Sequence, residues 1–198
     1  LDGHIRVVNY YDKVESLDST LYKDYNFNTS SYVSNYILAN NKNLYESIIL
    51  YAINNQSLNS NFNLHKFIIK GSYKIEDKNN IILGSGLANN LDLDIDDKIT
   101  LFNYDKIFNE NLFDAKIFTV SGIIKSGFPE YDKLLSFILY DSSESFITTK
   151  SSTFGKIINL NDKSQIDEIV DKLKVNYNTL YNSVETWKDR HVFLYKWL

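Results

Sequence analysis

One segment of this 198-residue sequence has a clear helical pattern, and it constrains how the neighbouring segments can pack. Between residues 162 and 174, apolar side chains recur at positions i, i+3, i+4 and i+7: Ile166, Ile169, Val170 and Leu173. Asp162, followed by Gln165 three residues later, matches a capping box at the start of this segment. The pattern predicts an amphipathic helix over residues 162–174.

Most of the remaining apolar segments have the length and composition of β-strands. They are short, rich in β-branched and aromatic residues, and separated by polar clusters. The predicted strands are residues 4–11, 32–39, 47–53, 66–71, 80–84, 99–102, 115–124, 134–141 and 156–160. We expect residues 99–102 and 115–124 to pair as a hairpin. Residues 26–31 are rich in Asn and Ser, and we expect a loop there.

Two further helices are expected near the ends of the chain. One is carried by Val14, Leu17, Leu21 and Tyr25, and the other by Trp187, His191, Leu194 and Leu198. Residues 54–63 have the lowest complexity, and we place a domain boundary just after them. Strand–helix–strand patterns near both ends, around a strand-rich middle, predict an α+β fold whose first and last segments pack together around an insertion.

Composition excludes several classes of partner and site. The net charge of -4, with lysines scattered singly, gives no electrostatic footprint for a nucleic acid. The chain has no cysteine, which excludes disulfides and thiolate metal sites. No run of about 18 apolar residues is present, as a membrane span would need. The absence of methionine leads us to expect a piece of a longer protein.

The stretch NIILGSGLANNL, residues 80–91, partly matches a dinucleotide-binding fingerprint. Gly84 and Gly86 follow a predicted strand, but the third glycine position is Asn89. Four carboxylates follow with no basic residue between Gly84 and the last of them: Asp92, Asp94, Asp96 and Asp97. A pyrophosphate would be repelled there. We therefore interpret the glycines as a scaffold turn, and keep a nucleotide-binding enzyme as an alternative.

The other chemistry-bearing residues do not assemble into a known catalytic motif. His4, His65 and His191 lack the spacing of a zinc site, the four aspartates lack the order of a calcium loop, and no G-x-S-x-G elbow is present. From the residues we expect a non-catalytic domain without a metal or other cofactor.

Two long stretches, IILGSGLANNLDLDIDDKITL and FTVSGIIKSGFPEYDKLLSFILYDSSESF, are similar to the extracytoplasmic domains of LolC/LolE-type ABC transporter permeases, within the wider MacB-like periplasmic core family. The residues that carry this resemblance are Ile82, Leu83, Gly84, Leu87, Ala88, Leu91, Asp97, Phe118, Val120, Gly122, Ile123, Gly127, Glu130, Tyr131, Asp132 and Phe146, together with residues 3–5 and Trp187. Where the family turn has two glycines, this chain has Asp92 and Asp96, and aspartate tolerates a positive φ better than most residues.

The resemblance implies a fold of two lobes. Residues 1–65 and 150–187 would form a porter-like βαβ lobe, residues 66–149 an inserted, strand-rich, sabre-like lobe, and residues 188–198 a membrane-proximal helix. We expect an apolar stretch of about 20 residues on each side of the chain in the parent protein, with Trp197 near the headgroups.

The resemblance also implies a function. Such a domain lies on the periplasmic face of the bacterial inner membrane and hydrolyses nothing. Its partners are a second permease subunit, a cytoplasmic ATPase subunit, a lipoprotein that is released from the membrane, and a periplasmic lipoprotein chaperone. The alternative within the family is a MacB-like transporter that exports a drug, peptide or toxin, or that signals mechanically.

A hairpin over residues 103–116 is the predicted partner-binding site. LolC-type members of the family use a hairpin at this place as a hook for the chaperone. In this chain the tip and its flanks are Ile107, Phe108, Asn109, Glu110, Asn111, Leu112 and Phe113. Packing of the four apolar residues against the core of the domain is the alternative explanation. The hairpin is shorter than the LolC hook and lacks its prolines, which leaves a non-recruiting, LolE-like role open.

Overall fold

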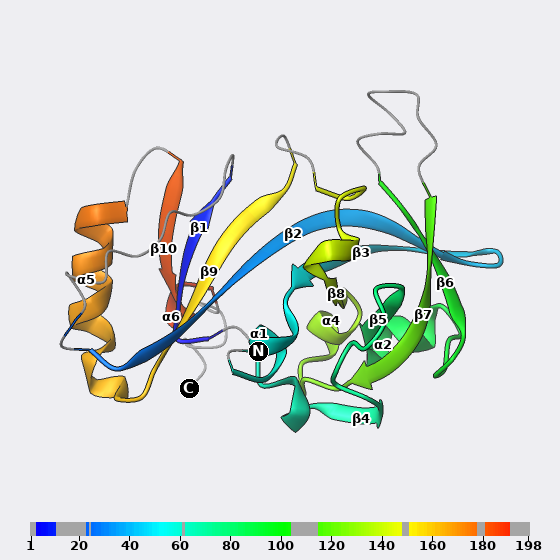
Figure 1. Ribbon diagram of the computed structural model, residues 1–198, viewed down its shortest axis with the longest axis horizontal. Coiled ribbons are helices and arrows are strands. Elements are labelled where there is room, and N and C mark those ends of the chain that lie inside the picture. The colour runs from blue at the N-terminus through cyan, green and yellow to red at the C-terminus, as the bar shows by residue number, and fades with distance from the viewer. Residues whose placement is uncertain are drawn as a thin grey trace.

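The computed structural model describes residues 3–10, 23, 25–60, 62–103, 115–147, 151–177 and 181–190. The strands are β1 (Ile5–Asn9), β2 (Phe27–Asn41), β3 (Leu44–Ile53), β4 (Ile68–Gly71), β5 (Asn80–Gly84), β6 (Lys98–Phe102), β7 (Ala115–Ile124), β8 (Leu135–Leu139), β9 (Thr153–Leu160) and β10 (Asn182–Thr186). The helices are α1 (Asn55–Ser60), α2 (Ser85–Asn90), α4 (Pro129–Asp132), α5 (Ile166–Tyr177) and α6 (Trp187–Arg190), with 3₁₀ turns η1 (Leu64–Lys66), η2 (Tyr140–Ser142) and η3 (Lys163–Gln165). The predicted α+β class is confirmed (Figure 1).

Part of the sheet closes on itself as a small barrel. Going round it, β2 pairs with β3, β3 with β8, β8 with β5, β5 with β7, β7 with β6, and β6 returns to β2. Inward-facing apolar residues of these strands form one core cluster, which α2 joins through Leu87 and Ala88. The predicted hairpin is confirmed, because β6 and β7 pair antiparallel from Lys98–Thr119 to Phe102–Ala115.

The other part of the sheet is open and lies on the left of Figure 1. There β10, β1 and β9 continue the sheet in that order, and β9 pairs with residues 27–34 of β2. Helix α5 covers this part and buries Ile169, Val170 and Leu173 against Ile5 and Ile158. The predicted helix is thus confirmed as α5, which follows the 3₁₀ turn η3. Asp162 caps η3, because its carboxylate accepts a hydrogen bond from the Ser164 amide at 2.9 Å. As expected, the first and last segments of the chain pack together.

Several elements differ from the sequence-based expectation. Residues 26–31 do not form a loop, because β2 begins at Phe27 and its polar residues pair along β9. Residues 54–63 include α1, whose Leu58 is fully buried together with Phe62. The sequence pattern does not predict strand β10. Its single buried apolar residue, Val184, gives no alternating pattern that could reveal it.

The strand β2 belongs to both parts of the molecule. Its first half pairs with β9, whereas residues 38–40 pair with β6 in the barrel. Strands β2 and β3 are therefore continuous with the barrel strands that follow residue 66 in the chain. The division of the chain into lobes at residues 65/66, 149/150 and 187/188 stays a prediction.

Candidate functional site

The glycine turn after β5 allows two backbone segments to pack closely. Gly84 has an ordinary extended conformation, with φ -67° and ψ 147°. A β-carbon at Gly84 would lie 2.3 Å from the carbonyl oxygen of Asp132, and one at Gly86 would lie 2.9 Å from the backbone nitrogen of Lys133. The glycines thus let α4 and the residue after it approach the start of α2. Backbone atoms occupy the space over the turn that a pyrophosphate would need, which argues against the nucleotide-binding alternative.

The four aspartates form a turn between α2 and β6. Asp92 and Asp96 have φ values of 52° and 70°, so both adopt the positive φ that is expected at the two glycine positions of the family turn. Asp97 accepts a hydrogen bond from the Asp94 amide at 2.7 Å, and Asp94 forms a 2.6 Å ion pair with Lys70. The hydrogen bonds from Lys70 and from the Ile95 amide hold the pKa of Asp94 below its usual value. This arrangement stabilises the turn itself.

The two histidines that the structure describes, His4 and His65, contact neighbouring elements of the fold. His4 lies in the open part of the sheet, where its Nδ1 accepts a hydrogen bond of 3.0 Å from the Leu160 amide. Burial, and then the positive charge of Lys163, lower the pKa of His4. His65 packs edge-on against Tyr73, and His191 lies outside the described residues. Among the residues that the structure describes, no group of three or more His, Asp or Glu side chains could hold a metal ion.

The two ends of the described chain are tied together by hydrogen bonds. Arg190, at the end of α6, donates to the carbonyl oxygen of Gly3 and to that of Glu185, each at 3.1 Å. The Trp187 amide donates to the carbonyl of His4 at 3.2 Å. Thr186 caps α6, because its hydroxyl oxygen accepts a hydrogen bond from the Asp189 amide. The Asp189 carboxylate in turn accepts bonds from the Thr186 amide and hydroxyl, and these bonds lower the pKa of Asp189. Residues near the two ends of the described chain therefore lie side by side.

The predicted hook residues lie outside the described part of the chain: Ile107, Phe108, Asn109, Glu110, Asn111, Leu112 and Phe113. The strands on either side are described, however, and they form the base of the hairpin. Phe102 at the end of β6 pairs with Ala115 at the start of β7. The predicted site therefore lies in the chain between the paired ends of these two barrel strands.

Exposed apolar and aromatic residues lie on the outside of the barrel around this base, with Asn40 and Thr100 between Tyr45 and Ile117. Tyr36 is 66% exposed, Tyr45 60% and Ile117 56%. Leu38 pairs with Phe102 across β2 and β6, and both are partly exposed. We call these five residues the outer face; none of them carries a charge.

The sequence pattern does not show that the two arginines hold neighbouring elements together. Their rarity, however, could have marked them as residues with a particular structural role. Arg6 and Arg190 are the only arginines of the chain, and both lie where β1, β10 and α6 meet. The Arg6 guanidinium lies 5.3 Å from the ring centroid of Tyr32 and donates to the Tyr51 hydroxyl at 3.4 Å. A planar guanidinium suits such stacked, half-buried positions better than the ammonium of lysine does.

No helix of the described ranges is long and apolar enough to cross a bilayer. Helix α6 covers the first four residues of the predicted C-terminal helix, and Leu194, Trp197 and Leu198 lie outside the described residues.

The fold is similar to those of solved transporter domains. No protein-family model and no curated protein matches the sequence. The periplasmic region of MacB from Actinobacillus actinomycetemcomitans matches with a TM-score of 0.56 and 14% identity, over 98% of this chain and 94% of that one. The extracellular domain of the noncanonic ABC-type transporter YknZ from Gram-positive bacteria matches with a TM-score of 0.51 and 12% identity, over 91% of this chain and all of that one. The chain therefore has the fold of the extracytoplasmic domains of MacB-like ABC transporters.

Proposed function

We propose that this chain is the extracytoplasmic, non-catalytic domain of a MacB-like ABC transporter permease. The likeness of fold to the MacB periplasmic region, over nearly the full length of both chains, is the observation that carries this proposal. The hydrogen bond between Arg190 and Gly3 adds support. A domain whose first and last segments lie side by side can be inserted between two neighbouring membrane spans without distortion.

The proposal defines the surroundings of the domain. It would lie on the periplasmic face of the bacterial inner membrane, with a membrane span before and after it. Because the domain binds no nucleotide in this proposal, ATP hydrolysis would occur in a cytoplasmic subunit, and a second permease subunit would complete the transporter.

Thiol labelling of the full-length parent protein tests this location. The domain has no cysteine, so a single Val175→Cys change adds one thiol at a position that is 84% exposed on α5. A membrane-impermeant maleimide should label it in intact spheroplasts, while the parent without this change reports any background. Labelling that appears only after lysis would contradict the proposal.

We further propose that the transporter releases lipoproteins from the inner membrane and passes them to a periplasmic chaperone. The sequence resemblance to LolC/LolE-type permeases supports this finer assignment, and residues 107–113 would be the hook. The outer face supports a binding role as well, because exposed, uncharged and mostly aromatic or aliphatic side chains around the base of the hairpin would extend the contact area.

Alanine substitutions in the hairpin test the hook. Truncating Phe108 or Phe113 should weaken chaperone binding by about 1–3 kcal/mol and leave the free energy of unfolding nearly unchanged. Val175→Ala, a change of an exposed apolar residue on α5, is the matched control and should alter neither quantity. A loss of several kcal/mol of stability with unchanged binding would show that the two phenylalanines belong to the core.

A MacB-like transporter with another cargo is the second candidate, since one of the structural relatives is the periplasmic region of MacB. The parent gene separates the candidates. An ATPase domain fused to the permease would favour a MacB-type exporter, whereas a separate ATPase subunit would favour lipoprotein release.

A further inference from the structure

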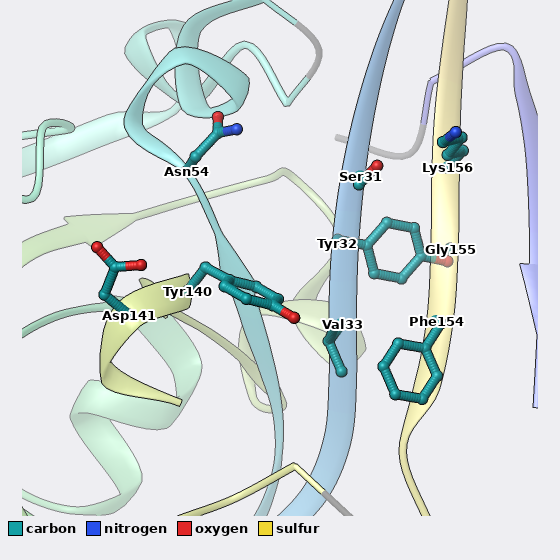
Figure 2. A pocket seen from close by; sticks show the side chains of 9 residues that line it. All are labelled: Ser31, Tyr32, Val33, Asn54, Tyr140, Asp141, Phe154, Gly155 and Lys156. Atoms are coloured by element: carbon teal, nitrogen blue, oxygen red, sulfur yellow. The ribbon is translucent and has the colours of Figure 1, made fainter. Parts of the chain in front are cut away.

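A pocket lies where β2 leaves the barrel and pairs with β9 (Figure 2). Its volume is about 380 Å³, and its walls come from β2, β9, η2 and the residue after β3. The register places Ser31 beside Lys156 and Val33 beside Phe154, so these four side chains lie on the same face of the sheet. The η2 turn forms the opposite wall.

The lining is divided into an apolar part and a polar part. Val33 and Phe154 are buried neighbours on β2 and β9, and the ring of Tyr140 reaches from η2 toward Val33 (Figure 2). Ser31, Asn54 and Lys156 lie toward the other end of the pocket, at the top of Figure 2. The pocket thus has an apolar floor and a polar, cationic end.

Lys156 sets the charge of the polar end. Its side chain is half-buried in the lining, and burial lowers the pKa of its ammonium group. An anion bound beside this group would favour its charged form. Asp141, the carboxylate of the lining, is exposed, and it points away from the Tyr140 ring in Figure 2. Asn54 adds a polar group: its Oδ1 accepts bonds from the Ser57 amide and hydroxyl, which leaves its Nδ2 directed toward the pocket side (Figure 2).

From this geometry we propose that the pocket binds a single-chain amphiphile with an anionic head, of the fatty-acid class. The alkyl chain would lie between Tyr140, Val33 and Phe154, and the carboxylate would face Lys156 and Ser31. The volume is at the lower end of the range of about 300–1,000 Å³ that is typical of small-molecule pockets. One short alkyl chain therefore fits better than a two-chain lipid. The proposal does not rest on the transport function proposed above.

Titration of the domain with decanoate, octanoate and decanol tests this assignment. Decanoate should bind with one saturable site, below its micellar concentration. Octanoate should bind about tenfold more weakly, because it buries two fewer methylene groups. Amide chemical shifts of residues 31–33 and 154–156 should change during the titration.

Two variants test separately how the carboxylate and the alkyl chain of the ligand contribute to its affinity. Lys156→Gln should weaken decanoate about tenfold and leave decanol nearly unchanged, because a charge-assisted hydrogen bond is lost. Tyr140→Ala should weaken both ligands. Lys98→Gln on β6 and Tyr45→Ala on β3 are the matched controls, and neither should change the affinity.

Tyr140 is 39% exposed and Lys156 is half-buried, so both variants should fold, and thermal unfolding checks this. The proposal is overturned if decanoate shows no saturable binding, if its shifts map elsewhere, or if folded Lys156→Gln binds decanoate as the parent does.

Discussion

The phenol ring of Tyr32 on β2 covers Gly155 on β9 so closely that a β-carbon at Gly155 would lie 2.2 Å from Cζ of the ring. The same ring contacts the Arg6 guanidinium on β1 and the ring of Tyr51 on β3, with centroid separations of 5.3 and 5.6 Å. Tyr32 therefore links the open part of the sheet to the barrel, and the missing side chain at Gly155 makes this crossing possible. Burial, partly offset by Arg6, raises the pKa of Tyr32 far above its usual value.

Gly155→Ala should destabilise the domain by about 2–4 kcal/mol, because neither the buried ring nor the two paired strands can move away without loss of packing. Chemical denaturation measures the change. A double-mutant cycle with Tyr32→Ala attributes it to this contact: the added methyl group should cost much less once the ring is gone. A cost that is equal in both backgrounds would contradict the account.

Asp96→Gly should stabilise the domain by about 0.5 kcal/mol, because glycine adopts the positive φ of 70° without the steric cost that aspartate incurs. Asp96→Val should destabilise it by about 1–2 kcal/mol, since a β-branched residue tolerates this conformation poorly. Asp97→Gly is the neighbouring control. It should destabilise, because the Asp97 carboxylate accepts the Asp94 amide hydrogen. The same sign for both glycine variants would refute the conformational explanation.

Arg190→Gln should loosen the contact between the two ends of the described chain. The side chain then loses its bonds to Gly3 and Glu185, so the Trp187 amide, which donates to His4, should exchange with solvent faster. Hydrogen exchange measured by NMR gives the rate, and Lys125→Gln, at an exposed site after β7, serves as the control. Unchanged protection of Trp187 would show that Arg190 does not hold this junction.

Residues 192–198 should exchange faster in the isolated domain than the helix over residues 162–174. The predicted apolar stripe of Trp187, His191, Leu194 and Leu198 would find part of its contacts only in the parent protein, whereas α5 is packed on the sheet. Equal protection of the two segments would count against a membrane-proximal helix.

The stability of the domain should depend on pH through His4. The folded state lowers the pKa of His4 below its ordinary value of 6.5, so the unfolded chain binds the proton more readily. The free energy of unfolding should therefore decrease as the pH falls below about 6.5, and it should be fully restored above that value.

His4→Asn should remove this component, because the group that titrates is absent, and His65→Gln should retain it. Measurements between about pH 5 and pH 7.5 avoid the carboxylates of Asp94, Asp162 and Asp189, whose pKa values are lowered and whose contribution is lost at more acidic pH. An identical pH dependence in His4→Asn and the parent would contradict the assignment.

The sequence by itself determined the elements whose signal is local. The stripe from Ile166 to Leu173 specifies α5, because one periodic face must be buried. The hairpin of β6 and β7, the cap at Asp162 and the turn at Asp92 and Asp96 likewise depend on residues close in the chain. These signals were sufficient for the α+β class and for the close packing of the first and last segments.

Only the tertiary structure decided how distant segments meet. The polar start of β2 is a strand because its backbone pairs with β9, more than a hundred residues away. Likewise, β10 is a strand because its backbone pairs with β1. Closure of the barrel requires β6 to reach β2, which no local pattern encodes. The pocket between Tyr140, Phe154 and Lys156 and the crossing of Tyr32 over Gly155 arise from the same long-range pairing. Such contacts depend on register and on the space left between side chains, and both are properties of the folded chain as a whole.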